Sequence, residues 1–146
     1  MAADNLPIGS AKPKAPLCKR AANRYRRGMA GGDLGWTVDS RSTARVVAAV
    51  GRIDERTSAA FGEGLAAEVA AAADDGKALV VIDLAGIEYM SSRGLRGLTL
   101  AQRRATERSV TVVLARPGET MREILAISRY DMVFKVYETI EAALAS

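Results

Sequence analysis

The chain has 146 residues, enough for one domain with a hydrophobic core but not for a second full domain. Hydrophobic residues make up 49% and aromatic residues 5%, which predicts a core of Ala, Val, Leu and Ile and suits an alanine-rich α/β protein. The net charge is +4. The absence of histidine excludes Ser-His-Asp and Cys-His catalysis and the usual zinc ligand sets. Any enzyme chemistry would therefore use carboxylates as acids or bases.

Residues 1–35 are predicted to form a disordered basic N-terminal tail, because they are rich in Ala, Pro, Gly and basic residues and lack any sustained period. Residues 1–30 contain seven Lys or Arg and one acidic residue, Asp4, whereas the rest of the chain has 14 basic and 16 acidic residues. The positive charge therefore belongs to the tail. A tail that contacts nucleic acid or anionic lipid is a minor alternative, since Tyr25 is its only aromatic residue.

Cys18, the only cysteine, excludes an intramolecular disulfide. The basic N-terminus is not followed by the run of about 7 to 15 apolar residues that a signal peptide needs. The longest apolar stretches, such as residues 78–82, are far shorter than the roughly 20 residues of a membrane span. We therefore expect a cytoplasmic protein that binds no membrane. Met29, just before the first patterned segment, is an alternative start.

Residues 36–146 are predicted to form the folded domain, beginning with a β-hairpin. Residues 36–39 and 45–50 favour strands on either side of a polar turn. Thr57 or Ser58 is then predicted to cap a helix that runs to about Ala73. The apolar residues of one face of this helix are Phe61, Leu65, Val69 and Ala72.

Residues 78–84 are apolar without alternation, which is typical of a central strand covered on both faces. A connection over residues 85–91 leads to a helix over about 92–107. A strand at 110–115, a helix opened by Pro117-Gly118, a short edge strand at 133–136 and a last helix capped by Thr139 complete the chain. This order predicts an α/β fold: a mostly parallel central sheet with an antiparallel N-terminal hairpin and about four helices.

The segment that runs from the central strand into the helix at 92–107 carries the most informative motif. It resembles the signature of the STAS domain family, which includes anti-sigma factor antagonists and the tails of sulfate transporters. The residues that match are Asp83, Gly86, Tyr89, Met90, Ser92, Gly94 and Leu95. A second family element is a strand followed by glycine, an aliphatic residue, aspartate and a threonine-initiated helix. Gly51, Ile53, Asp54 and Thr57 match it, and the resemblance spans roughly residues 36–146.

The resemblance implies a STAS-like fold and a protein that is not an enzyme and needs no cofactor. It implies an anti-sigma factor antagonist in which Ser92 is phosphorylated by a serine kinase that is also the anti-sigma factor. A metal-dependent serine phosphatase restores the hydroxyl, and the unmodified form binds the kinase. Ser91 and Arg93 depart from the best-known antagonists, which have Asp and Ser there. The departure at Arg93 leaves the identity of the partner open.

The position of Ser92 supports a switch on physical grounds. A phosphate at the first turn of a helix meets unpaired backbone N–H groups and the positive end of the helix dipole. Arg93 and Arg96 are placed to add charge-assisted hydrogen bonds, and Gly94 would let a partner approach closely. The plainer alternative is an ordinary helix cap at Ser91 or Ser92, and Ser91 is the alternative phosphoacceptor.

Two aspartates and an outward stripe of the helix at 92–107 are further candidates for function. Asp54 is either a local turn residue or part of the partner surface beside Ser92. Asp83 is expected to accept hydrogen bonds from loop N–H groups under the turn that contains Ser92, with Gly86 as structural support. A magnesium site at Asp54 and Asp83 is a weaker alternative. Leu100 is expected to contact the partner from an outward stripe of the same helix. The stripe consists of Arg96, Leu100, Arg103 and Arg104.

Two other functions compete with the anti-sigma factor antagonist. One is a non-catalytic STAS sensor or carrier subunit that binds a nucleotide or lipid within a larger complex. The other is a small hydrolase that uses Asp54 or Asp83, which the absence of histidine and of a glycine-rich phosphate loop disfavours. The expected partners are proteins, with no direct contact to nucleic acid.

Overall fold

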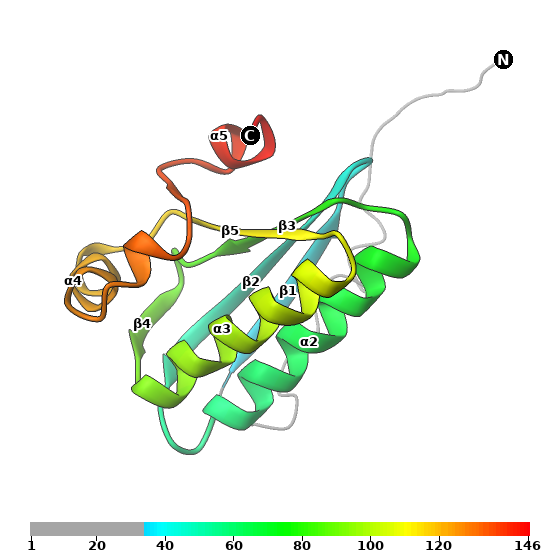
Figure 1. The fold of residues 1–146 in the computed structure, drawn as a ribbon. Coiled ribbons are helices and arrows are strands. Elements are labelled where there is room, and N and C mark those ends of the chain that lie inside the picture. Colours follow the sequence, from blue (N-terminus) through cyan, green and yellow to red (C-terminus); the bar gives the residue numbers. More distant parts are fainter. Residues whose placement is uncertain (1–33) are drawn as a thin grey trace, which may run out of the picture.

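The computed structural model describes residues 34–146, whose hydrophobic patterns produce six strands and four α-helices (Figure 1). The strands are β1 (Gly35–Ser40), β2 (Ala44–Ile53), β3 (Leu79–Asp83), β4 (Ile87–Met90), β5 (Thr111–Ala115) and β6 (Val136–Tyr137). The helices are α2 (Ser58–Asp74), α3 (Ser92–Glu107), α4 (Glu119–Ile127) and α5 (Ile140–Leu144), and a 3-10 turn, η1, spans Tyr130–Met132.

The main sheet has the strand order β1-β2-β3-β5-β6. β1 and β2 form the predicted antiparallel hairpin, and the pairs β2–β3, β3–β5 and β5–β6 are parallel. The apolar strand β3 lies at the centre, as predicted, because its residues face apolar partners on both sides of the sheet: Val80 and Ile82 point to one core cluster and Val81 to the other. The predicted α/β class is thus confirmed.

The helices α2 and α3 lie side by side over one face of the sheet, and both begin at the same end of the molecule (Figure 1). The predicted inner face of α2 is buried, and Phe61 packs edge-on against Trp36 of β1, with ring centroids 6.2 Å apart. The short helix α5 packs on the opposite face through Ala143. The side chains of α2 and α3 therefore contribute to the larger core, and both helices start at one edge of it.

A buried carboxylate on α2 ties the helix layer to the hairpin. Glu68 has only 5% of its surface exposed and accepts hydrogen bonds from Arg45 Nε at 3.1 Å and Arg45 Nη2 at 2.6 Å. Its other oxygen accepts a longer bond from Trp36 Nε1, at 3.4 Å. Because Trp36 and Arg45 belong to β1 and β2, this network holds both hairpin strands against α2.

Two details of the sequence prediction are corrected. Residues 87–90, expected within a connection, form β4, which pairs with the end of β2 and lies off the main strand path. The last strand is β6 at Val136–Tyr137 rather than 133–136, because Phe134 turns into the core after η1 and Val133 is exposed. The chain reaches the edge of the sheet only after these residues.

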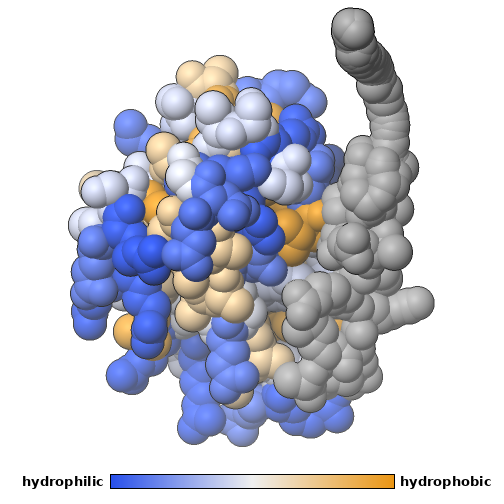
Figure 2. All heavy atoms as spheres, turned by 90° about the vertical axis from the view of Figure 1, so that its right-hand side faces the viewer, coloured by the Kyte–Doolittle hydropathy of each residue, from blue (hydrophilic) through white to orange (hydrophobic). Residues whose placement is uncertain are grey.

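Most of the predicted tail, with Cys18, Tyr25 and Met29, lies outside the described residues. Its last two positions are described: Leu34 is buried in the core and Gly35 begins β1. On the side drawn in Figure 2 the described surface is mostly hydrophilic, and hydrophobic residues show only in small areas. None of the helices formed by residues 34–146 combines the length and hydrophobicity needed to cross a bilayer.

Candidate functional site

The pairing of β4 with β2 brings the two predicted motif elements together. Ile53 and Met90 are paired at the ends of these strands, and the backbone N–H of Ser91 donates to the carbonyl of Ile53 at 2.8 Å. A bulge follows Gly51, whose φ of 127° is a value that residues with a side chain rarely adopt. The chain therefore enters the turn before α2 and the turn before α3 from adjacent positions.

Ser91 and Ser92 have different environments at the start of α3. Ser91 is the half-buried N-cap, with an extended backbone, and its hydroxyl accepts a hydrogen bond from the Gly94 N–H at 3.3 Å. Ser92 is the first helical residue and is exposed. Within residues 34–146 its hydroxyl has no recorded hydrogen-bond partner. The cap is therefore provided by Ser91, and the Ser92 hydroxyl is open to solvent.

Gly94 is buried under this turn, and its packing corrects the predicted reason for a glycine. A Cβ at Gly94 would lie 2.5 Å from Met90 Cγ and 2.7 Å from Ile53 Cγ2. Both of those side chains are in the core. The missing side chain therefore lets α3 start close to the ends of β2 and β4, and it does not open a surface to a partner backbone.

The other predicted contact residues of α3 lie on the outside of the helix. Arg93 and Arg96 are exposed beside Ser92, and Leu100 keeps 42% of its surface exposed one turn further on. Arg93 and Arg96 line the same groove between α2 and α3 as Leu100. The helix thus presents guanidinium groups and one apolar side chain on the side next to the Ser92 turn.

Asp54 forms the turn before α2. Its carboxylate accepts a hydrogen bond from the Arg56 N–H at 3.0 Å, and this bond holds the pKa of Asp54 below its usual value of 3.8. Thr57, predicted as a side-chain cap, instead donates its hydroxyl to the Arg52 carbonyl at 2.7 Å and accepts from the Asp54 N–H at 3.0 Å. The turn is therefore held by its own residues, with an ionised carboxylate next to the Ser91 strand end.

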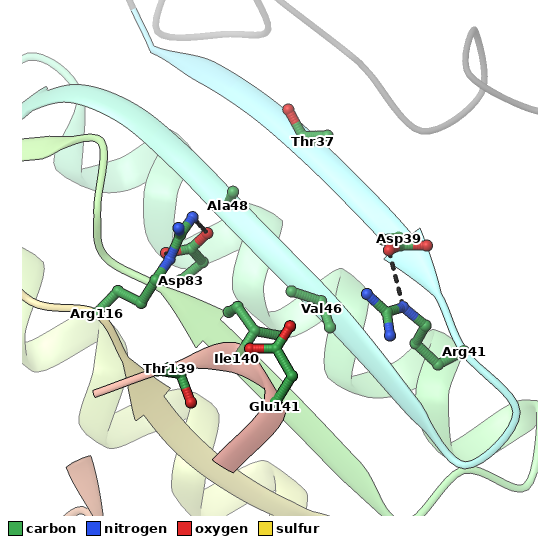
Figure 3. A pocket seen from close by; sticks show the side chains of 10 residues that line it. All are labelled: Thr37, Asp39, Arg41, Val46, Ala48, Asp83, Arg116, Thr139, Ile140 and Glu141. Carbon is green, nitrogen blue, oxygen red and sulfur yellow. Dashed lines mark hydrogen bonds and ion pairs between the residues drawn. The ribbon is translucent and has the colours of Figure 1, made fainter. Parts of the chain in front are cut away.

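Asp83 belongs to a different part of the fold (Figure 3). It accepts from the Ala85 N–H at 3.1 Å, a loop bond of the predicted kind, and it also pairs with Arg116, whose Nη2 lies 2.6 Å from Oδ2. The pair raises the pKa of Arg116 above its ordinary value. Because β4 intervenes, the loop that Asp83 bonds leads into β4 and does not lie under the turn that contains Ser92.

Gly86 lies in that loop, directly before β4, the strand that pairs with β2. Its carbonyl accepts a hydrogen bond from the Gly51 N–H at 3.0 Å, and a Cβ at Gly86 would lie 2.8 Å from Val50 Cγ2. The pairing of Arg116 with Asp83 was not predicted from the sequence. The only available signal was that Arg116 follows the strand next to the one that ends in Asp83, which places both at neighbouring strand ends.

The two aspartates are not brought together. Ala48 of β2 is paired with Asp83, and Asp54 lies six residues further along the chain, about 20 Å at strand spacing. Among residues 34–146 no group of three or more acidic or cysteine side chains is placed to hold a metal ion. The described residues therefore give no support to a magnesium site at Asp54 and Asp83.

Comparisons with known proteins agree with this arrangement. A family model described as Mlab, STAS domain, matches residues 36–136. BtrV of Bordetella bronchiseptica, named as a candidate anti-sigma factor antagonist, is 36% identical over 89 residues, which are 61% of this chain and 77% of BtrV.

Solved structures show the same fold. An anti-sigma factor antagonist from Mycobacterium paratuberculosis has a TM-score of 0.68 at 26% identity, over 77% of this chain and 92% of that one. The phosphorylated form of SpoIIAA, a cell fate determinant of Bacillus, has a TM-score of 0.54 at 18% identity, over 75% of this chain and 96% of SpoIIAA. With its two motif elements joined at the ends of β2 and β4, the chain belongs to the STAS domain family.

Proposed function

We propose that this chain is an anti-sigma factor antagonist, a non-enzymatic protein whose docking is controlled by phosphorylation of Ser92. Its partner is a serine kinase that also serves as the anti-sigma factor. The unmodified form binds the kinase and frees the sigma factor, and the phosphorylated form releases the kinase. The observation that carries the proposal is the exposed Ser92 at the first position of α3, next to a separate cap residue, Ser91.

The start of α3 accommodates a phosphate without loss of the fold. The Gly94 and Leu95 N–H groups bond to the Ser91 hydroxyl and carbonyl, at 3.3 and 3.0 Å, so modification of Ser92 leaves both bonds in place. The helix dipole and the guanidinium groups of Arg93 and Arg96 favour an anion at this position. We expect phosphorylation to add about −1.5 to −2 charges to the surface and to leave the core unchanged.

The proposed partner surface surrounds Ser92. It comprises Asp54 and Ser91 at the two strand ends and Arg93, Arg96 and Leu100 on α3. Gly94 supports this surface from below, through its contacts with the core. A kinase docked here would have to desolvate or repel a phosphate on Ser92, so a single modification would block the whole contact.

The remaining parts of the proposal follow the same logic. A metal-dependent serine phosphatase returns Ser92 to the hydroxyl form, which makes the switch reversible. BtrV and the mycobacterial relative carry the anti-sigma factor antagonist name, which supports an anti-sigma factor as the partner. We propose that residues 36–146 perform this role in the cytoplasm, with residues 1–35 as a separate tail.

The test is phosphorylation of the full chain by the anti-sigma kinases encoded in its source genome, each purified and supplied with ATP. We expect one kinase to add a single phosphate, located at Ser92 by tandem mass spectrometry. S92A should accept none, whereas S91A, the matched control, should still be modified. We also expect S92D to weaken the kinase complex at least tenfold in a calorimetric titration.

Two results would contradict this proposal. One is a phosphate that S92A still accepts with the same stoichiometry, because the acceptor would then be another residue. The other is equal affinity of the kinase for the wild-type chain, S92D and the phosphorylated chain, because the modification would then control nothing.

A further inference from the structure

A groove of about 580 Å³ runs between α2 and α3 and begins beside the Ser92 turn. The two helices are close because glycines meet where they pack: a Cβ at Gly97 would lie 3.3 Å from the Gly62 Cα. Small side chains also line the groove, among them Ala59, Ala66 and Ala101. The volume is in the range of protein clefts that bind ligands, about 300 to 1,000 Å³.

The α3 side of the groove is strongly basic. Arg93, Arg96 and Arg104 line it together with Leu100, at the spacing of three to four residues that places side chains on one face of a helix. Arg103, which belongs to the same predicted stripe, does not line it. The structure therefore divides the stripe into groove residues and one neighbour outside.

The three groove arginines are available for a partner. All three are exposed, and within residues 34–146 no hydrogen bond or ion pair is recorded for their guanidinium groups. The α2 side contributes a single acidic side chain, Glu63. The groove thus combines an excess of positive charge with small apolar residues, and an exposed leucine lies between the arginines along α3.

We propose that this groove docks an acidic segment of the partner protein, an inference that rests on the function proposed above. Guanidinium groups bind carboxylates in a two-point geometry, and interface centres combine arginine with apolar anchors. Nucleic acid fits less well, since no aromatic side chain lines the groove for base stacking.

The spacing of the arginines defines the segment. Arg93 and Arg104 are eleven residues apart on α3, which is about 16 Å along the helix axis. A segment of three helical turns or about five extended residues spans that length. It would carry carboxylates at both ends and an apolar residue that contacts Leu100.

The groove also explains how one phosphate on Ser92 would act at a distance. Ser92 and Arg96 are four residues apart and Arg93 is adjacent, so a phosphate on Ser92 draws both guanidinium groups into charge-assisted bonds. Two of the three groove arginines are then neutralised, and the phosphate repels the carboxylates of the segment. Phosphorylation thereby lowers the net positive charge of the groove, without any change in the helices.

The first test uses a probe that does not depend on the kinase: a ten-residue peptide of eight glutamates and two leucines, titrated into the ¹⁵N-labelled full chain. We expect chemical-shift changes at Gly62, Gly97 and their neighbours. R104E should weaken binding at least fivefold and S92D at least twofold. R103E, with the same charge change one residue away but outside the groove, should change the affinity less than twofold.

Several outcomes would overturn the inference: no shift changes in the groove, equal losses for R104E and R103E, or tighter binding of a ten-nucleotide single strand at the same residues, which would assign the groove to nucleic acid. A second titration with the kinase separates the two proposals. A kinase that modifies Ser92 but binds R104E and R103E equally leaves the proposed function standing and defeats the groove as its docking site. A peptide that binds the groove while no kinase modifies Ser92 defeats the proposed function alone.

Discussion

At the start of α3, neighbouring residues divide the structural and functional tasks. Ser91 holds the helix start through its hydroxyl, and Gly94 allows the close approach of the helix to Met90 and Ile53. Ser92, between them, is exposed. Because the supporting residues are separate from the proposed acceptor, changes at Ser92 should alter binding without altering stability, whereas changes at Gly94 should lower stability.

The first prediction concerns Gly94. In G94A the new methyl group would overlap Met90 Cγ and Ile53 Cγ2, both buried, so we expect the free energy of unfolding to fall by about 1–2 kcal/mol. This loss already allows for the higher helix propensity of alanine. Urea denaturation followed by circular dichroism measures the change.

The control for this variant is G118A, which adds the same methyl group at the start of α4, where nothing lies within 4 Å of the Cβ position. Its free energy of unfolding should fall by about 0.5 kcal/mol, because a helix N-cap favours glycine over alanine, and no steric loss should be added. Equal stability of G94A and the wild-type chain would mean that the strand ends yield easily, and the packing argument would be wrong.

The second prediction concerns the pH dependence that Asp54 contributes. The Arg56 N–H holds the pKa of Asp54 below 3.8, so the folded state favours the ionised carboxylate more than the unfolded state does. The resulting stabilisation is fully present above pH 3.8 and is lost as the pH falls through the depressed pKa. D54N lacks this titration.

We therefore expect the stability difference between the wild-type chain and D54N to be largest near neutral pH and to shrink in acid. Urea titrations of both proteins between pH 2 and 7 measure the difference. A stability difference that stays constant over that range would show that the turn does not lower the pKa of Asp54.

Individual contacts were predictable only where they depend on local sequence. The cap at the start of α3 and the turn role of Asp54 follow from residue type and position, and the structure contains both. The ion pair between Asp83 and Arg116 depends on the register of β3 and β5, which the sequence pattern does not specify. The buried face of Gly94 depends on β4, whose pairing was not expected.

At the scale of elements, a buried carboxylate, Glu68, helps to join the hairpin to the helix layer. Glu68 receives hydrogen bonds from Arg45 and Trp36, one on each hairpin strand. Arg45 has only 16% of its side chain exposed, so its guanidinium group needs this partner. The contact links residues that are up to 32 positions apart in the chain.

The third prediction follows from this network. E68A leaves the largely buried Arg45 with only Asp75, at 3.6 Å, and we expect the free energy of unfolding to fall by about 3 kcal/mol. The control is E63A, which removes an exposed carboxylate from the same helix and should cost less than about 0.5 kcal/mol. Thermal and urea unfolding measure both, and similar losses for the two variants would contradict the role of Glu68.

Elements were predictable in proportion to their length. The helix α3 has the predicted bounds, since its apolar residues recur over sixteen positions and a polar cap precedes them. The strand β3 was evident from a continuous apolar run. In contrast, β4 has four residues, of which Glu88 is exposed and Tyr89 half-buried, so it has neither an apolar run nor an alternation. Such a strand exists only because β2 extends past the main sheet to meet it.

At the scale of the whole molecule, a sheet with helices on both faces supports the proposed partner surface. The order of elements predicted this architecture, because parallel strands linked by helices have few possible arrangements. The groove between α2 and α3 was not predicted, since it depends on the meeting of Gly62 and Gly97, which lie on separate helices. Tertiary packing, rather than local pattern, creates that part of the site.

The off-path position of β4 has a consequence for any enzyme that modifies Ser92. β4 is paired with β2 over only three residue pairs, whereas β2, β3 and β5 are joined by longer ladders (Figure 1). Local unfolding of β4 and the first turn of α3 would release the serine loop as an extended strand while the rest of the sheet stays intact. A transferase that binds its substrate in extended form would have to overcome the free energy of this local opening, which exposes the core side chains Ile87 and Met90.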